Sequence, residues 1–229
     1  MAAWKLGPAL ATGNTVVLKS AEQSPLSVLY LANLIKEAGF PPGVVNILSG
    51  LGRSAGNAIA VHEDIDKIAF TGSTQTGCAI MKAASTNLKN ITIETGGKSP
   101  LLIFEDADIE QAVKWAHIGI MSNSGQVCCA TSRILCHESI YDEFVKKFSE
   151  YTTSTSVIGD PFDEDTSHGP QCSKLQYERV MEYIEKGKKD GAKLVLGGTT
   201  PGGNYISPTI FKDVEVSFLL ETACAVAWC

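Results

Sequence analysis

The sequence has no excess of basic residues, no apolar run of membrane-spanning length and few aromatic residues. Its 229 residues carry a formal net charge of −6, and 7% of them are aromatic. An acidic balance gives no electrostatic footprint for nucleic acid, and a transmembrane helix needs roughly 20 consecutive apolar residues. The first ten residues, MAAWKLGPAL, lack the basic, apolar and small-residue order of a signal peptide. We therefore expect a cytoplasmic globular protein that binds neither nucleic acid nor membranes.

Paired CxxC motifs are also absent, although the sequence contains seven cysteines. Cys128 and Cys129 are adjacent, which is a poor spacing for zinc ligands, so we expect no metal site. An odd number of cysteines without a signal peptide favours free thiols in a reducing compartment.

Short apolar segments alternate with helical patterns along the chain, which predicts an α/β fold. Such alternation is typical of a doubly wound parallel sheet, here a Rossmann-like cofactor domain. We place the end of this domain at residue 96, where the alternation loosens, and part of a second α/β domain at residues 97–214. The predicted strands are 15–19, 44–48, 66–70, 90–94, 101–104, 132–136 and 193–196. The predicted helices are 25–38, a segment ending near 62, 73–84, 107–121 with Asp106 as its cap, 140–151 and 173–189.

Two glycine-bearing turns follow predicted strands, where ligands bind in open α/β sheets. One turn runs from Gly72 to Gly77 and opens a helix, so its backbone N–H groups are available to a pyrophosphate. The other contains Gly52 and Gly56. Neither has the GxGxxG spacing, and the alternative is that both are packing turns.

Lys19 and Glu22 follow the first predicted strand, near the same edge of the sheet. Together they can hydrogen-bond the hydroxyls of a ribose. The alternative is that both are solvated surface charges, which is the commoner situation for these residue types.

Cys128 and Cys129 lie on a glycine-bearing connector, and either thiol is a candidate nucleophile. The alternative for each is a small buried apolar residue. Glu94 ends a strand beside Gly96 and Gly97, where a partly buried carboxylate can act as a base; pairing with Lys98 is the alternative. Ser173 and Gln176 are spaced as a helix capping box.

Several long motifs together resemble the NAD(P)-dependent aldehyde dehydrogenases. They are VVLKSAEQSPLS, NLIKEAGFPPGVVNI, FTGSTQTG, ITIETGGKSP and NSGQVCCATSR, in the order and spacing of that family from residue 1 to about 214. The resemblance implies that Cys128 attacks an aldehyde to form a thiohemiacetal, and that hydride transfer to the nicotinamide leaves a thioester. It further implies that Glu94 activates the hydrolytic water.

The resemblance also implies a set of residues that bind the cofactor. We expect NAD rather than NADP, because Glu22 would repel a 2′-phosphate. The cofactor-binding candidates are Lys19, Glu22, Gly52, Gly56, Phe70, Gly72, Ser73, Thr74, Gln75, Thr76, Gly77 and Gln176.

The chain departs from the family at both ends. Family members are about twice as long, and an asparagine that donates to the oxyanion would lie upstream of Met1, which leaves the Cys128 N–H as the expected donor. Residues 215–229 do not match and are expected to be an aberrant, frameshifted tail. The strands through which the family forms homo-oligomers are expected to be absent. A truncated, inactive or NAD-binding-only fragment is therefore the alternative function, and a cysteine acyltransferase or hydrolase without NAD is a third.

Overall fold

The structure is a computed structural model, and it describes residues 1–214 together with the backbone of residues 226–228. The chain forms two compact units, Met1–Thr95 and Gly96–Cys229. Each unit is described by itself. Nearly all of the predicted aberrant tail, residues 215–225 and 229, lies outside the described residues.

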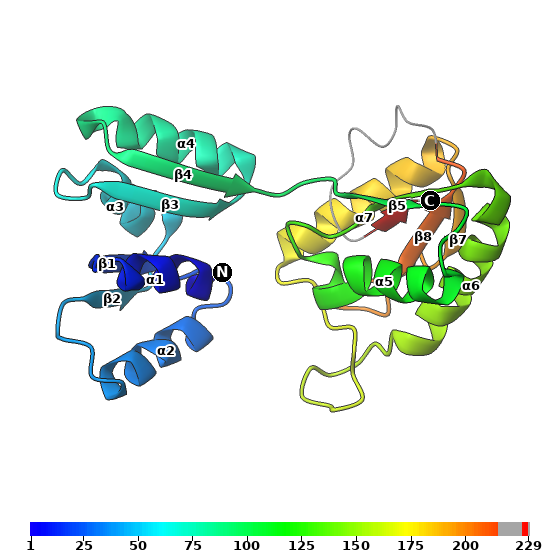
Figure 1. Cartoon of the computed structure of the whole chain (residues 1–229), viewed down its shortest axis with the longest axis horizontal. Coiled ribbons are helices and arrows are strands. Elements are labelled where there is room, and N and C mark those ends of the chain that lie inside the picture. The colour runs from blue at the N-terminus through cyan, green and yellow to red at the C-terminus, as the bar shows by residue number, and fades with distance from the viewer. Residues whose placement is uncertain (215–225, 229) are drawn as a thin grey trace. The chain divides into compact units, whose positions relative to one another are not determined.

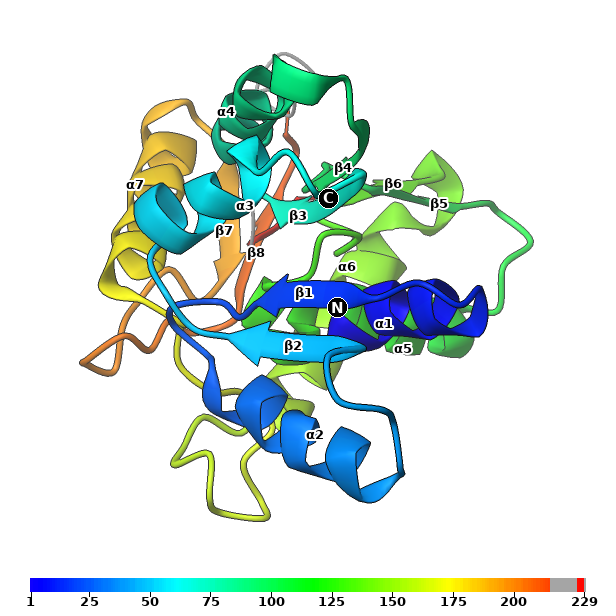
Figure 2. The same ribbon diagram turned by 90° about the vertical axis from the view of Figure 1, so that its left-hand side faces the viewer.

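The first unit begins with helix α1 (Ala2–Ala11), which the sequence patterns did not predict because it contains Gly7 and Pro8. Strands β1 (Val16–Lys19) and β2 (Val45–Leu48) pair in parallel, and α2 (Leu26–Glu37) connects them. Figure 2 shows the two arrows side by side and pointing the same way. A parallel pair requires such a crossover connection.

A second strand–helix–strand segment completes this unit. Strands β3 (Lys67–Gly72) and β4 (Asn90–Thr95) pair in parallel, with α4 (Thr74–Ala84) between them in the chain and packed along them (Figure 1). The π-helical turn η1 (Gly52–Gly56) leads into α3 (Asn57–Val61), and the 3₁₀ turn η2 (Ser85–Asn87) follows α4. The buried cluster here consists of Ala60, Ile68 and Ala84.

The second unit contains a five-stranded sheet in the order β5-β6-β9-β8-β7. The strands are β5 (Pro100–Ile103), β6 (Arg133–Cys136), β7 (Lys193–Leu196), β8 (Thr209–Lys212) and β9 (Val226–Trp228). All neighbouring pairs are parallel except β7 and β8, which pair antiparallel.

Helices cover both faces of this sheet, because alternate strand residues point to opposite sides. Helices α5 (Ile109–Met121) and α6 (Tyr141–Thr155) pack on the face that carries Ile210. Helix α7 (Lys174–Lys189) packs on the face that carries Phe211. Short 3₁₀ turns, η3 (Ser122–Gly125) and η4 (Glu138–Ile140), follow α5 and precede α6.

The α/β class is confirmed, and each predicted helix and strand is present with ends shifted by a few residues. One continuous doubly wound sheet is not seen, since the first unit has two separate two-stranded ladders. Strands β8 and β9 were not predicted. The predicted cap Asp106 is wrong: Asp108 is the N-cap of α5, and its Oδ1 accepts from the Gln111 amide at 3.1 Å. No helix among the described residues is long and apolar enough to cross a membrane.

Candidate functional site

Lys19, Glu22, Gly52 and Gly56, which are separated in the sequence, lie together in the first unit. The Glu22 carboxylate accepts a hydrogen bond from the Gly52 amide. A Cβ atom added at Gly52 would lie 3.6 Å from Glu22 Oε1, and one added at Gly56 would lie 3.6 Å from Lys19 Cε. The absence of side chains at both glycines therefore leaves space facing Lys19 and Glu22.

Lys19 holds the end of β1 against the turn that follows β2. Its Nζ donates to the carbonyl oxygens of Ser20 at 2.8 Å and Gly50 at 3.0 Å. An ammonium group has three donors, so one N–H remains for a further acceptor beyond those found among the described residues. The alternative of a purely solvated lysine does not describe this half-buried side chain.

The predicted turn from Gly72 to Gly77 contains the last residue of β3, the N-cap of α4 and the first turn of that helix. Ser73 is the N-cap: its Oγ accepts from the Thr76 amide at 3.2 Å and donates to Thr76 Oγ1 at 2.9 Å. Thr74 and Gln75 begin the exposed first turn of the helix, where backbone amides lack intrahelical acceptors.

Both glycines at the ends of this turn are in close contact with β-strand side chains. A Cβ at Gly72 would lie 2.5 Å from Cζ of Phe70, and one at Gly77 would lie 2.9 Å from Cγ2 of Ile93. Phe70 therefore covers the turn, and Gly77 lets α4 approach the strands closely.

Glu94 lies on β4 directly opposite Thr71 of β3, next to the start of that turn. Its side chain is exposed.

In the second unit, the cysteine pair follows an unusual backbone turn at the end of α5. Asn123 and Ser124 have φ of 51° and 54°, and Gly125 has φ of 75°. Left-handed backbone is uncommon for residues other than glycine, although asparagine adopts it more readily than most. Cys128 and Cys129 are both exposed beyond this turn, so exposure does not distinguish the two thiols.

The residues around Cys128 attach it to neighbouring segments. The Gly97 amide donates to the Cys128 carbonyl at 3.2 Å, and the Thr131 amide donates to the Gly119 carbonyl of α5 at 3.0 Å. Within residues 1–214, no acceptor is found for the Cys128 amide itself.

Asn123 and Gln126 use their side-chain amides within the loop. Asn123 Nδ2 donates to the Gln126 carbonyl at 3.0 Å, and Gln126 Nε2 donates to the Asn123 carbonyl at 3.1 Å. Gln126 also contacts residues 169–172, and Ser124 does the same. Residues 169–172 were not predicted, because a segment that is neither helix nor strand has no hydrophobic periodicity.

Gln176 lies in the first turn of α7, where its amide donates to the Oγ of the N-cap Ser173 at 3.2 Å. This is the first half of the predicted capping box.

Two histidines of the second unit, His117 and His168, lie close enough to interact electrostatically. Burial lowers the pKa of His117, and the neighbouring His168 lowers it further. Burial also lowers the pKa of His168, against a backbone hydrogen bond with Ile206 that raises it. His117 Nε2 lies 3.1 Å from Ser156 Oγ, and its ring packs edge-on against Tyr151.

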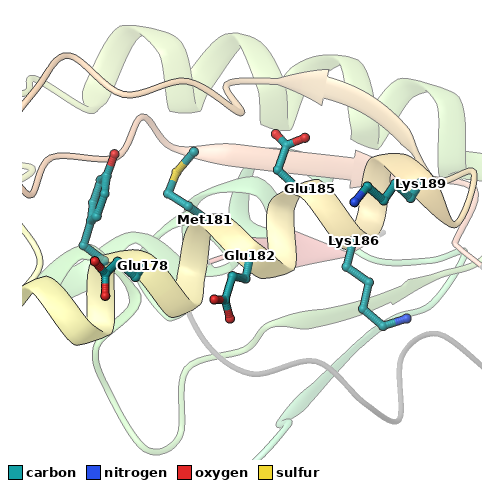
Figure 3. A pocket seen from close by; sticks show the side chains of 7 residues that line it. Glu178, Met181, Glu182, Glu185, Lys186 and Lys189 are labelled. Atoms are coloured by element: carbon teal, nitrogen blue, oxygen red, sulfur yellow. The ribbon is translucent and has the colours of Figure 1, made fainter.

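A shallow hollow runs along α7 and contains none of the predicted site residues among those that the structure describes (Figure 3). It is lined by Tyr177, Glu178, Met181, Glu182, Glu185, Lys186 and Lys189. Across residues 1–214, no three His, Cys, Asp or Glu side chains form a group suited to a metal ion.

Comparisons with known proteins agree on one family. The sequence profile described as "Aldehyde dehydrogenase family" matches residues 1–220. An aldehyde dehydrogenase of Emericella nidulans is 58% identical over 217 residues, which are 93% of this chain and 44% of that protein. A mitochondrial aldehyde dehydrogenase of Homo sapiens is 56% identical over 218 residues, which are 94% of this chain and 42% of that protein.

A solved structure gives the same result for the fold. The NAD⁺ complex of an aldehyde dehydrogenase from Bacillus cereus is 46% identical to this chain, with a TM-score of 0.93. The matched region is 100% of this chain and 47% of the Bacillus chain. The chain thus spans less than half the length of the relatives that it matches.

Proposed function

This chain belongs to the aldehyde dehydrogenase family, and on that basis we propose that it contributes to the NAD-dependent oxidation of an aldehyde to a carboxylic acid. The observation that carries the proposal is the loop around Cys128. An exposed thiol follows a turn fixed by hydrogen bonds, and the amide of the same residue has no acceptor within residues 1–214.

Cys128 is the proposed nucleophile. Its thiolate adds to the aldehyde carbonyl and gives a thiohemiacetal, whose oxyanion can accept from the Cys128 N–H. Loss of hydride from this adduct leaves an acyl thioester on the same sulfur. Water then attacks the thioester and releases the carboxylic acid and the free thiol. The motif order of the family favours Cys128 over Cys129.

NAD would supply the hydride acceptor, and the first unit has features that fit it. The space beside Gly52 and Gly56, facing Lys19 and Glu22, suits a ribose. The N-terminus of α4 after Gly72 suits an anionic pyrophosphate. Glu22 favours NAD over NADP, because a carboxylate repels a 2′-phosphate.

The remaining roles rest on the motifs. We propose that residues 1–96 form part of a cofactor-binding domain and residues 97–214 part of a catalytic domain. Glu94 is the proposed base that takes a proton from the hydrolytic water, and Gln176 is a proposed contact of the nicotinamide-side ribose. A cytoplasmic location remains a proposal, since the relatives include a mitochondrial protein. The homo-oligomers that the resemblance implies are not proposed for this chain.

The second candidate function is NAD binding without turnover. It is favoured by the first unit, where Lys19 and Glu22 face the space beside Gly52 and Gly56.

The test is the absorbance of NADH during incubation of the purified chain with NAD and a simple aldehyde. We expect NADH formation that Cys128→Ser abolishes and Cys129→Ser retains. If NADH does not form but NAD raises the melting temperature of the chain, the second candidate is correct. If Cys129→Ser is the inactive variant, the proposed nucleophile is wrong.

A further inference from the structure

The backbone that precedes Cys128 needs support from outside its own segment. Asn123, Ser124 and Gly125 are three consecutive left-handed residues. Glycine adopts this conformation freely, whereas serine does not. Such backbone persists where the surrounding structure determines it.

Residues 169–172, which we call the latch segment, provide that support on the serine side. Ser124 Oγ donates to the Gly169 carbonyl at 2.8 Å. In the other direction, Gln171 Nε2 donates to the Ser124 carbonyl at 3.2 Å. The hydroxyl and the carbonyl of the left-handed serine are therefore both hydrogen-bonded to the latch segment.

Gln126 makes a second reciprocal connection, two residues before the thiol. Its Oε1 accepts from the Cys172 amide at 2.8 Å, and its Nε2 lies 3.4 Å from the Pro170 carbonyl. Four hydrogen bonds thus join residues 124–126 to the latch segment.

Burial makes the hydrogen bond between Gln171 and the Ser124 carbonyl hard to replace. Ser124 is 4% exposed and Gln171 is 3% exposed. A buried carbonyl that loses its hydrogen-bond donor destabilises the folded state by its full desolvation free energy, because water cannot replace the donor.

The latch segment is itself fixed to the body of the second unit. The Gln171 amide donates to the Asn204 carbonyl at 2.9 Å, and the His168 amide donates to the Val157 carbonyl at 2.9 Å. The side chain of His168 is 5% exposed. The position of the cysteine loop therefore depends on a segment about 45 residues further along the chain.

We propose that Gln171 and Gln126 are positioning residues for the Cys128 thiol: through the latch segment they hold the left-handed turn that presents this thiol rather than its neighbour. The inference rests on the proposed role of Cys128 as nucleophile. Neither glutamine reacts in this scheme. Their side-chain hydrogen bonds restrict the orientations that the Cys128 and Cys129 side chains adopt after the turn.

The test compares the alkylation rates of Cys128 and Cys129 by a limiting amount of iodoacetamide, resolved by peptide fragmentation in a mass spectrometer. The urea-unfolded chain gives the ratio for an unrestrained loop. We expect the native ratio to favour Cys128 by roughly tenfold over that reference, the factor that corresponds to about 1.4 kcal/mol. Gln171→Met and Gln126→Leu, which keep side-chain size and remove the hydrogen bonds, should each return the ratio close to the unfolded value.

Two controls separate positioning from general loss of stability. Val180→Ala removes buried apolar volume from α7, at a fully buried position in a different cluster, and should leave the native ratio unchanged. Gln126→Glu keeps the acceptor for the Cys172 amide and should retain part of the preference. Because Gln126 is only partly buried, its variants test the proposal even if Gln171→Met does not fold.

The proposal is overturned by a native ratio equal to the unfolded one, by an unchanged ratio in the glutamine variants, or by an equal loss in Val180→Ala. None of these measurements requires NAD or an aldehyde. A chain that forms no NADH but shows the expected ratios would refute the proposed function and leave the positioning role intact.

Discussion

The two units of this protein differ in how their functional residues are supported. The first unit carries all but one of the candidate cofactor residues, yet its buried cluster contains only two alanines and one isoleucine, and α2 has no buried residue. The second unit carries Cys128 and has large fully buried side chains such as Phe144, Phe148 and Phe211. Most cofactor candidates thus belong to a unit with few buried side chains. Cys128 follows a turn with unfavourable left-handed backbone, in a unit with a large buried core. Since buried apolar area is the main source of stability, we expect the second unit to be the more stable.

The largest expected effect comes from the core of the second unit. Phe148 is fully buried and stacks on Phe144, with ring centroids 5.5 Å apart. Phe148→Ala should destabilise the second unit by about 3 to 5 kcal/mol, measured by denaturant unfolding combined with hydrogen exchange of peptides from each unit. The exposed Trp115 on α5 is the matched control, and Trp115→Ala should have little effect. Equal losses in both variants would show that the packed core does not hold this unit.

A glycine of the first unit tests whether its thin core is nevertheless closely packed. A Cβ at Gly77 would lie 2.9 Å from Ile93 Cγ2, so Gly77→Ala should cost about 1 to 3 kcal/mol through overpacking. The neighbouring Cys78 is exposed, and Cys78→Ala should be close to neutral. Hydrogen exchange of β3 and β4 peptides measures the change. A neutral Gly77→Ala variant would mean that α4 does not pack against β4 as the structure shows.

Matched helix caps compare the two units at one kind of interaction. Ser73 caps α4 in the first unit and Asp108 caps α5 in the second. Replacement of either by alanine should cost about 1 kcal/mol, as measured by denaturant unfolding. Ser73→Ala should also weaken NAD binding in a calorimetric titration, whereas Asp108→Ala should not. An equal loss of NAD affinity in both variants would contradict the assignment of the cofactor to the first unit.

The smallest expected effect is a pH dependence confined to the second unit. The pKa values of His117 and His168 are lowered from 6.5, mainly by burial. A histidine with a lower pKa in the folded state binds fewer protons than in the unfolded chain, so its stabilising contribution is present above about pH 6.5 and is lost as pH falls. Hydrogen exchange of α6 peptides between about pH 7.5 and 5, corrected for the intrinsic pH dependence of exchange, should show this loss. His168→Gln should reduce the slope, and an unchanged slope would exclude His168 as its source.

Periodicity predicted the secondary structure well where a segment was long or bounded by turn residues. It missed α1, which contains glycine and proline, and β8, whose run after Pro208 is short. It could not predict whether the strands form one sheet or several, because strand pairing depends on contacts that local sequence does not encode.

The residues of the candidate site were likewise predicted only in part from the sequence. Glycine turns and strand ends indicated Gly52, Gly56 and the turn at Gly72, and the structure places the first two beside Lys19 and Glu22. The choice of Cys128 over Cys129 came from the family motif alone. The latch segment was not predicted, since its hydrogen bonds join residues about 45 positions apart through loop backbone and side chains of ordinary type.

The most direct test of the central claim is to detect the acyl group on Cys128. The chain carrying Glu94→Gln, in which hydrolysis of the thioester should be slow, is incubated with NAD and a simple aldehyde and then analysed by peptide mass spectrometry. We predict an acyl adduct on Cys128 that requires NAD and is absent from Cys128→Ser. An acyl adduct located on Cys129, or one that forms equally without NAD, would contradict this account of the protein.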